Sequence, residues 1–179
     1  MITLLLGLGA LLLLAGGGGN NSSKREDGGM LPGGAELLDP DVDFLADTIG
    51  WPYSWGGGGP DTAWKDGALG VDCSGYALMV AVELGQVDPS IGRLRAVDIA
   101  NMCDPVPAGE QQPGDFAVYP NHIMVVASYP DADGHSAVIG ASGGGPDTHG
   151  DDPNAHVKVF PSERYRRDFL TFARWKEAA

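Results

Sequence analysis

The sequence predicts an α+β fold in which helices come first and a meander of antiparallel strands follows. Between residues 37 and 102, apolar side chains recur at helical spacing. After Pro113 they occur in short runs that are separated by Pro, Gly, Asp and Asn. With 179 residues, 43% of them hydrophobic, the chain is long enough to form one domain with a core of its own.

The N-terminal segment, residues 1–19, is apolar, and no charged side chain precedes Lys24. The apolar run is shorter than the roughly 20 residues of a membrane-spanning helix. It also lacks the basic residues that usually open a secretory signal. Three interpretations stay open: an export signal or weak membrane anchor, an apolar tail packed in an assembly such as a virion, or a poorly ordered end.

Residues 20–36 are predicted to be a flexible linker, because they are rich in Gly, Asn and Ser and cannot bury enough apolar surface to fold. The folded domain is predicted to span residues 37–179. Its first helix would begin at Asp39-Pro40 and end at Gly50. The apolar face of that helix would hold Val42, Leu45, Ala46 and Ile49.

A short polar step, Asp72-Cys73-Ser74-Gly75, comes directly before the apolar residues 76–84, which predict a buried helix. Cys73 would then lie in the first helical turn, where free backbone N–H groups and the positive end of the helix dipole stabilise a thiolate. A thiolate at this place is a candidate nucleophile.

The next helix is predicted over residues 93–102. Its apolar positions are Leu94, Val97, Ile99 and Met102. Cys103 follows at its end and is predicted to be a small core residue. Since the chain has only two cysteines, no disulfide framework can be inferred.

Five strands are predicted in the second half of the chain, from short apolar or alternating runs. They cover residues 116–119, 123–128, 137–141, 157–160 and 169–175.

A nucleophilic thiol needs a base within hydrogen-bond reach. His122 is the best candidate, because it follows a turn at Pro120 and opens a predicted strand that would hold the imidazole rigidly. His135 begins the next strand. His149 and His156 lie in or beside a Gly- and Asp-rich loop and are predicted to be solvated or capping residues.

Composition and motifs disfavour several other functions. The formal net charge of −13 argues against nucleic acid or an anionic membrane surface as partner. The sequence contains neither a Cys-x-x-Cys nor a His-Glu-x-x-His metal motif. Its Gly runs lack the strand and helix context that cradles phosphate. No metal and no cofactor are therefore predicted.

Four motifs in this order resemble the NlpC-type cysteine peptidases of bacterial cell walls. They are Tyr53-Ser-Trp-Gly-Gly57, Asp72-Cys-Ser-Gly75, Gln112-Pro-Gly-Asp115 and His122-Ile-Met-Val125, within a resemblance that covers about residues 50–142. The resemblance implies a papain-like fold, in which the nucleophile helix and the other N-terminal helices pack on an antiparallel sheet of about five or six strands. It also implies hydrolysis of an amide bond in peptidoglycan stem peptides, usually the bond between D-glutamate and the diamino acid.

The resemblance assigns Cys73 as nucleophile and His122 as general base and then acid. Tyr53, Asp72 and Ser74 would shape the site. The backbone N–H of Cys73 is the natural donor to the oxyanion.

The third catalytic position departs from the family pattern. Where the family usually has an orienting histidine, this sequence has Gly140. His135, Ser142, a backbone carbonyl or water could take over, because the role is control of tautomer and rotamer; otherwise activity is reduced.

The prediction is therefore a cell-wall endopeptidase that is secreted, held in the cell envelope, or carried on a phage tail or released as a lysin. Two alternatives stay open. One is a weak or inactive domain that serves as a structural or binding part of a phage tail-like particle. The other is a papain-like acyltransferase or amidase that acts on a different amide.

Overall fold

The computed structural model describes residues 34–58, 70–150 and 152–176. The predictions for the N-terminal segment and for most of the linker lie outside these residues. Within the described ranges, no helix is both long enough and apolar enough to cross a membrane.

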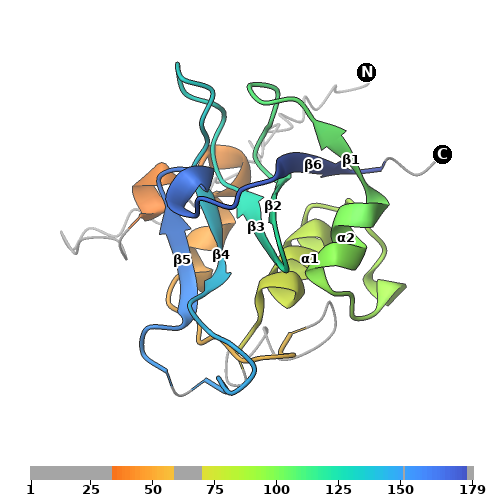
Figure 1. Ribbon diagram of the computed structural model, residues 1–179, viewed down its shortest axis with the longest axis vertical. Helices are drawn as coiled ribbons and strands as arrows, with labels where there is room; N and C mark the ends of the chain where they lie inside the picture. Colours follow the sequence, from red (N-terminus) through yellow and green to blue (C-terminus); the bar gives the residue numbers. More distant parts are fainter. Residues whose placement is uncertain (1–33, 59–69, 151, 177–179) are drawn as a thin grey trace, which may run out of the picture.

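One six-stranded sheet, antiparallel at every pairing, forms the centre of the molecule, with the strand order β1-β6-β2-β3-β4-β5 (Figure 1). Its strands are β1 (Cys103–Val106), β2 (Phe116–Tyr119), β3 (His122–Val126), β4 (Val138–Ser142), β5 (His156–Phe160) and β6 (Thr171–Trp175). The last five lie within two residues of the predicted runs at each end. Together with the helices, this sheet makes the protein α+β, as predicted.

The α1 helix (Cys73–Glu83) is the most buried helix of the described structure. Residues 74–81 are all buried, because this helix is apolar on every side and packs against β3 and β4. From the sheet, Ile123, Val125, Ile139 and Ala141 face the same core. The N-terminal end of α1 is therefore fixed relative to the beginning of β3.

The tight turn between β2 and β3 fixes where β3 begins. Tyr119 pairs with His122, which leaves Pro120 and Asn121 as a two-residue turn. Asn121 has a φ of 55°, a left-handed conformation that asparagine tolerates better than most residues. His122 consequently lies at the first position of a rigid strand, as the sequence predicted.

Two helix predictions need correction. The first helix is a 3-10 helix, η2 (Pro40–Thr48), interrupted at Val42, although Val42 and Leu45 are buried as expected. The second, α2 (Ala96–Met102), starts three residues later than predicted and buries Ala96 and Ile99. Val97 and Met102 are exposed, so the predicted apolar face was wrong at these two positions.

Cys103 is buried, as predicted, but it opens β1, a strand that the sequence did not predict. Pro105 lies within this strand and cannot donate a ladder hydrogen bond. Proline is tolerated here because β1 is an edge strand of the sheet.

Three short 3-10 helices complete the described structure: η1 (Ala35–Leu37), η3 (Pro89–Ile91) and η4 (Glu163–Tyr165). The last of them connects β5 to β6 and contributes to the site.

Candidate active site

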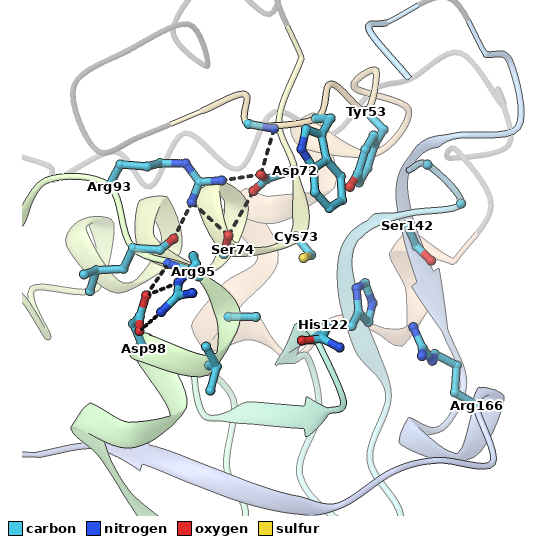
Figure 2. Close-up of a pocket in the computed structure, with 18 residues that line it drawn as sticks. Tyr53, Asp72, Cys73, Ser74, Arg93, Arg95, Asp98, His122, Ser142 and Arg166 are labelled. Carbon is cyan, nitrogen blue, oxygen red and sulfur yellow. Dashed lines mark hydrogen bonds and ion pairs between the residues drawn. The ribbon is translucent and has the colours of Figure 1, made fainter. Parts of the chain in front are cut away.

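A cavity of about 790 Å³ lies at the N-terminal end of α1 and brings most of the predicted site residues together. Figure 2 shows the sulfur of Cys73 facing the imidazole of His122 in this cavity. Tyr53, Asp72, Ser74 and Ser142 also line the cavity, as do three arginines, Arg93, Arg95 and Arg166.

The Asp72 carboxylate fixes the beginning of α1 with both of its oxygens. Oδ1 accepts hydrogen bonds from the Gly75 N–H (2.8 Å) and the Ser74 hydroxyl (3.1 Å), so Asp72 is the N-cap of the helix. Oδ2 accepts from the Gly56 N–H (3.0 Å) and forms an ion pair with Arg93. Asp72 therefore joins the helix start, the Gly-rich loop and Arg93.

Gly75 has a packing role that explains its place in the motif. A Cβ atom on this residue would lie 2.5 Å from the carbonyl oxygen of Gly57. Because no side chain intervenes, the Gly-rich loop can lie directly on the helix start, and Asp72 N–H donates to the same carbonyl (3.0 Å). The two glycine motifs thus pack against each other beside Cys73.

Tyr53 is only 3% exposed and covers one side of the cavity. Its ring lies against Gly144, where a Cβ atom would be 2.1 Å from the ring. Burial, and then the negative charges that Cys73 and Asp72 can carry, raise the pKa of Tyr53. The phenol therefore keeps its proton and can serve as a hydrogen-bond donor in the site.

Cys73 is partly exposed, and its thiol favours the protonated form. Burial raises the pKa of Cys73, and the Asp72 carboxylate raises it further. The backbone N–H groups of Ile123 and Ser74, and the charge of Arg93, lower the pKa by less than this. Desolvation therefore outweighs the stabilisation of a thiolate that is expected from the helix start.

His122 is 8% exposed, and burial lowers its pKa to about 4, with a further lowering by Arg166 that the charge of Asp168 opposes. The imidazole is therefore neutral at pH 7. A neutral imidazole can accept a proton, so the resting site combines a thiol with a free base rather than a thiolate with an imidazolium.

Tyr165, which no sequence motif indicates, makes the hydrogen bond to His122. Its hydroxyl lies 2.8 Å from Nε2 of the imidazole. Burial raises the pKa of Tyr165 to about 12, while a hydrogen bond with Ser142 works in the opposite direction. When the phenol oxygen accepts hydrogen bonds from Nε2–H of His122 and from the Ser142 hydroxyl, Nδ1 of His122 is free to take the proton of Cys73.

The strand register shows which residue of β4 lies level with His122. Val125 pairs with Ile139 and Val126 with Val138. Continuing this register places Gly140 level with Met124, and a Cβ atom on Gly140 would lie 2.8 Å from Sδ of Met124. Ser142 is level with His122 and lies on the same face of β4 as Gly140, two residues further along the strand.

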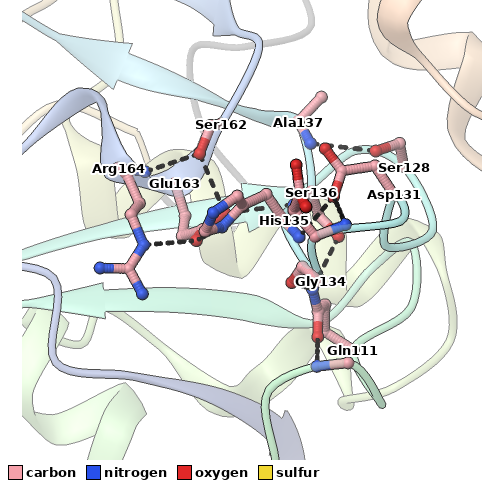
Figure 3. A network of polar contacts seen from close by, with 12 residues as sticks. Gln111, Ser128, Asp131, Gly134, His135, Ser136, Ala137, Ser162, Glu163 and Arg164 are labelled. Carbon is pink, nitrogen blue, oxygen red and sulfur yellow. Dashed lines mark hydrogen bonds and ion pairs between the residues drawn. The ribbon is translucent and has the colours of Figure 1, made fainter.

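His135 does not orient His122, because it belongs to a buried polar network around Glu163 (Figure 3). Its Nδ1 lies 2.8 Å from the Glu163 carboxylate, which also accepts from the Ser136 N–H (3.1 Å). Glu163 is 1% exposed, and its carbonyl accepts a hydrogen bond from the Tyr119 hydroxyl (2.7 Å). This network anchors η4, and thereby Tyr165 two residues later.

Little in the sequence indicates that Arg93 and Tyr165 belong to the site. Arg93 is the first residue of the helix predicted over residues 93–102, and Tyr165 lies in a charged segment without a motif, 43 residues after His122. Only the fold brings Tyr165 to the imidazole. In the part of the chain that the structure describes, no three His, Cys, Asp or Glu side chains gather as metal ligands.

No protein-family model matches the chain, and neither does any curated protein or any solved structure.

Proposed function

We propose that this protein is a papain-like cysteine peptidase that hydrolyses an amide bond in peptidoglycan stem peptides. The observation that carries the proposal is the cavity in which Cys73, at the start of α1, faces His122, at the start of β3, while Tyr165 fixes the imidazole. The choice of stem peptides as substrate rests on the four sequence motifs and their resemblance to the NlpC-type family.

In the first half of the reaction, Nδ1 of His122 takes the proton of the Cys73 thiol as the sulfur attacks the amide carbonyl carbon. The negative charge moves to the carbonyl oxygen, and the backbone N–H of Cys73 at the helix start can stabilise it. The imidazolium then gives its proton to the amide nitrogen. The C–N bond breaks, the amine leaves, and the acyl group stays on sulfur as a thioester.

In the second half, the neutral imidazole takes a proton from water, and the hydroxide oxygen attacks the thioester carbonyl. The C–S bond breaks, a carboxylic acid leaves, and the proton returns from His122 to the Cys73 sulfur. Proton transfer thus runs through His122 in both halves, and the site requires no other titrating group.

The inactive-domain alternative was motivated by Gly140. Tyr165 lies at His122 and forms a hydrogen bond with Ser142, so these two residues can take over the orienting role that Gly140 cannot fill. Their position favours the active peptidase over this alternative.

Defined muropeptides, incubated with the full chain and analysed by mass spectrometry, test the proposal. We expect two fragments whose masses locate one hydrolysed amide bond within the stem peptide. Prior treatment with iodoacetamide should stop their release. Transfer of the acyl group to an added amine would indicate an acyltransferase, and cleavage of an amide outside the stem peptide would contradict the choice of substrate.

Tyr165→Phe is expected to lower kcat about tenfold with little change in KM. The variant loses one hydrogen bond worth roughly 1–1.5 kcal/mol, and the imidazole loses the partner that selects its tautomer. Steady-state kinetics on one muropeptide measure the effect. Tyr129→Phe, which removes an exposed hydroxyl 3.4 Å from Asp41, is the matched control. An unchanged kcat in Tyr165→Phe would show that Tyr165 does not orient His122.

A further inference from the structure

We propose that Arg166 binds a free carboxylate on the part of the substrate that leaves with the amine, so that the site takes peptides with an acidic leaving residue. This inference rests on the proposed function and specifies the substrate of the same site. The carboxylate can be the α-carboxylate or a side-chain carboxylate of that residue, because both present the same two oxygens to a guanidinium.

The position of Arg166 is the first argument. It follows Tyr165, lines the cavity, and lies beside His122 in Figure 2. His122 is the group that gives a proton to the leaving nitrogen. A side chain next to His122 therefore contacts the part of the substrate that carries this nitrogen, whereas Asp72 and Arg93 lie at the Cys73 side of the cavity.

The charge balance of the cavity is the second argument. The chain carries a formal net charge of −13, yet three arginines line this cavity. The carboxylates that pair with Arg93 and Arg95 belong to Asp72 and Asp98, which also line the cavity. Asp168, the partner of Arg166, does not line it. Among the described residues, Arg166 is therefore the cavity arginine whose carboxylate partner lies outside the cavity lining.

The guanidinium of Arg166 is also held ready for a ligand. Its Nε and Nη2 donate to the Asp168 carboxylate at 2.9 and 2.7 Å, and its central carbon lies 5.4 Å from the centre of the Tyr119 ring. Among the described residues, Nη1 donates no hydrogen bond within the fold. A planar guanidinium fixed on one edge can offer its other edge to a carboxylate with little further loss of entropy.

Electrostatics supply the third argument. A cation beside His122 opposes the imidazolium that the reaction must form. Arg166 lowers the pKa of His122, and Asp168 opposes this effect by less. A substrate carboxylate on Arg166 would offset the remaining positive charge at the moment when the imidazolium forms. An acidic substrate should thus have a higher kcat as well as a lower KM, because its charge assists the base.

The test uses two stem peptides that differ only in a carboxylate or a carboxamide on the leaving residue. With the unmodified chain, we expect kcat/KM to be about 10- to 100-fold higher for the acid, the range typical of a charged hydrogen-bonded pair. Arg166→Gln should cleave both peptides equally well, and Arg166→Lys should keep part of the preference. The control Arg167→Gln makes the same charge change at the next residue, which is exposed and outside the cavity, and should keep the full preference.

A binding measurement separates this inference from the proposed activity. In a Cys73→Ala background, calorimetry should give tighter binding of the acid than of the amide, and adding Arg166→Gln should remove the difference. If the chain cleaves nothing but shows this pattern, the peptidase proposal fails and the carboxylate site stands. Equal affinity for the two peptides, no binding of either, or a preference that survives in Arg166→Gln would overturn the carboxylate site.

Discussion

Cys73→Ala is expected to lower kcat/KM for stem-peptide hydrolysis by about 10⁴-fold or more. Loss of the nucleophile removes the covalent pathway, and removal of a nucleophile in hydrolases of this kind leaves only the contribution of binding and oxyanion stabilisation. The measurement is release of defined fragments from muropeptides, with mass spectrometry as the readout.

The fold should survive this substitution, because Asp72, rather than Cys73, caps α1 with its side chain. An unchanged thermal midpoint would confirm this. The control is Cys103→Ala, which removes the other thiol. Burial raises the pKa of Cys103 to about 12, so Cys103 is a poor nucleophile, and this variant should remain active and sensitive to iodoacetamide. If Cys73→Ala digests stem peptides as fast as the parent chain, the nucleophile is another group.

The parts of the site that could be predicted from the sequence are those fixed by local structure. The Asp72 cap and the helix start occur within one short motif, so Cys73 could be placed on its helix. The turn at Pro120 and Asn121 similarly fixes His122 at the start of a strand. The α+β class follows from the change of apolar spacing along the chain.

The parts that could not be predicted depend on the pairing of distant segments. The residues around Gly140 match the family sequence, so position 140 was assigned the orienting role. The register of β4 against β3, however, places Ser142 level with His122. Tyr165 reaches the imidazole only because the Glu163 network anchors η4 against the loop at Ser136. Neither relation leaves a periodic pattern in the sequence.

The protonation states of Cys73 and His122 could not be predicted from the sequence either, because they depend on burial. A helix start lowers the pKa of a thiol when solvent reaches the sulfur, but here desolvation and Asp72 act in the opposite direction. The same desolvation lowers the pKa of His122. One physical cause therefore shifts both groups toward the neutral state, with the proton on sulfur until substrate arrives.

His122→Ala is expected to lower kcat by about 10³-fold or more, because Cys73 would then have to lose its proton to water. His135→Ala is the control, since it removes an imidazole from the Glu163 network rather than from the cavity. It should retain most of the activity of the parent chain. Similar losses in the two variants would mean that His122 acts only through the fold.

The pH dependence offers a sharper test of the same residue. With a pKa of about 4, His122 stays unprotonated and active down to about pH 4, so kcat/KM should fall only below that value. The folded-state pKa lies below the unfolded value of 6.5, so the unfolded chain binds more protons between pH 6.5 and 4. The free energy of unfolding should therefore decrease as the pH falls through this range, and less so in His122→Ala.

An ion pair between Cys73 and His122 could produce a similar acid limb, but it would give thiolate absorbance at neutral pH. We expect this absorbance, measured as the difference between the parent chain and Cys73→Ala, to appear only at a pH above the usual thiol range, because burial raises the pKa of Cys73. Iodoacetamide should accordingly react slowly at pH 7 and faster as the pH rises. Thiolate absorbance at pH 6 would show that Cys73 and His122 form an ion pair rather than a neutral pair. In that case His122 would act first as the acid.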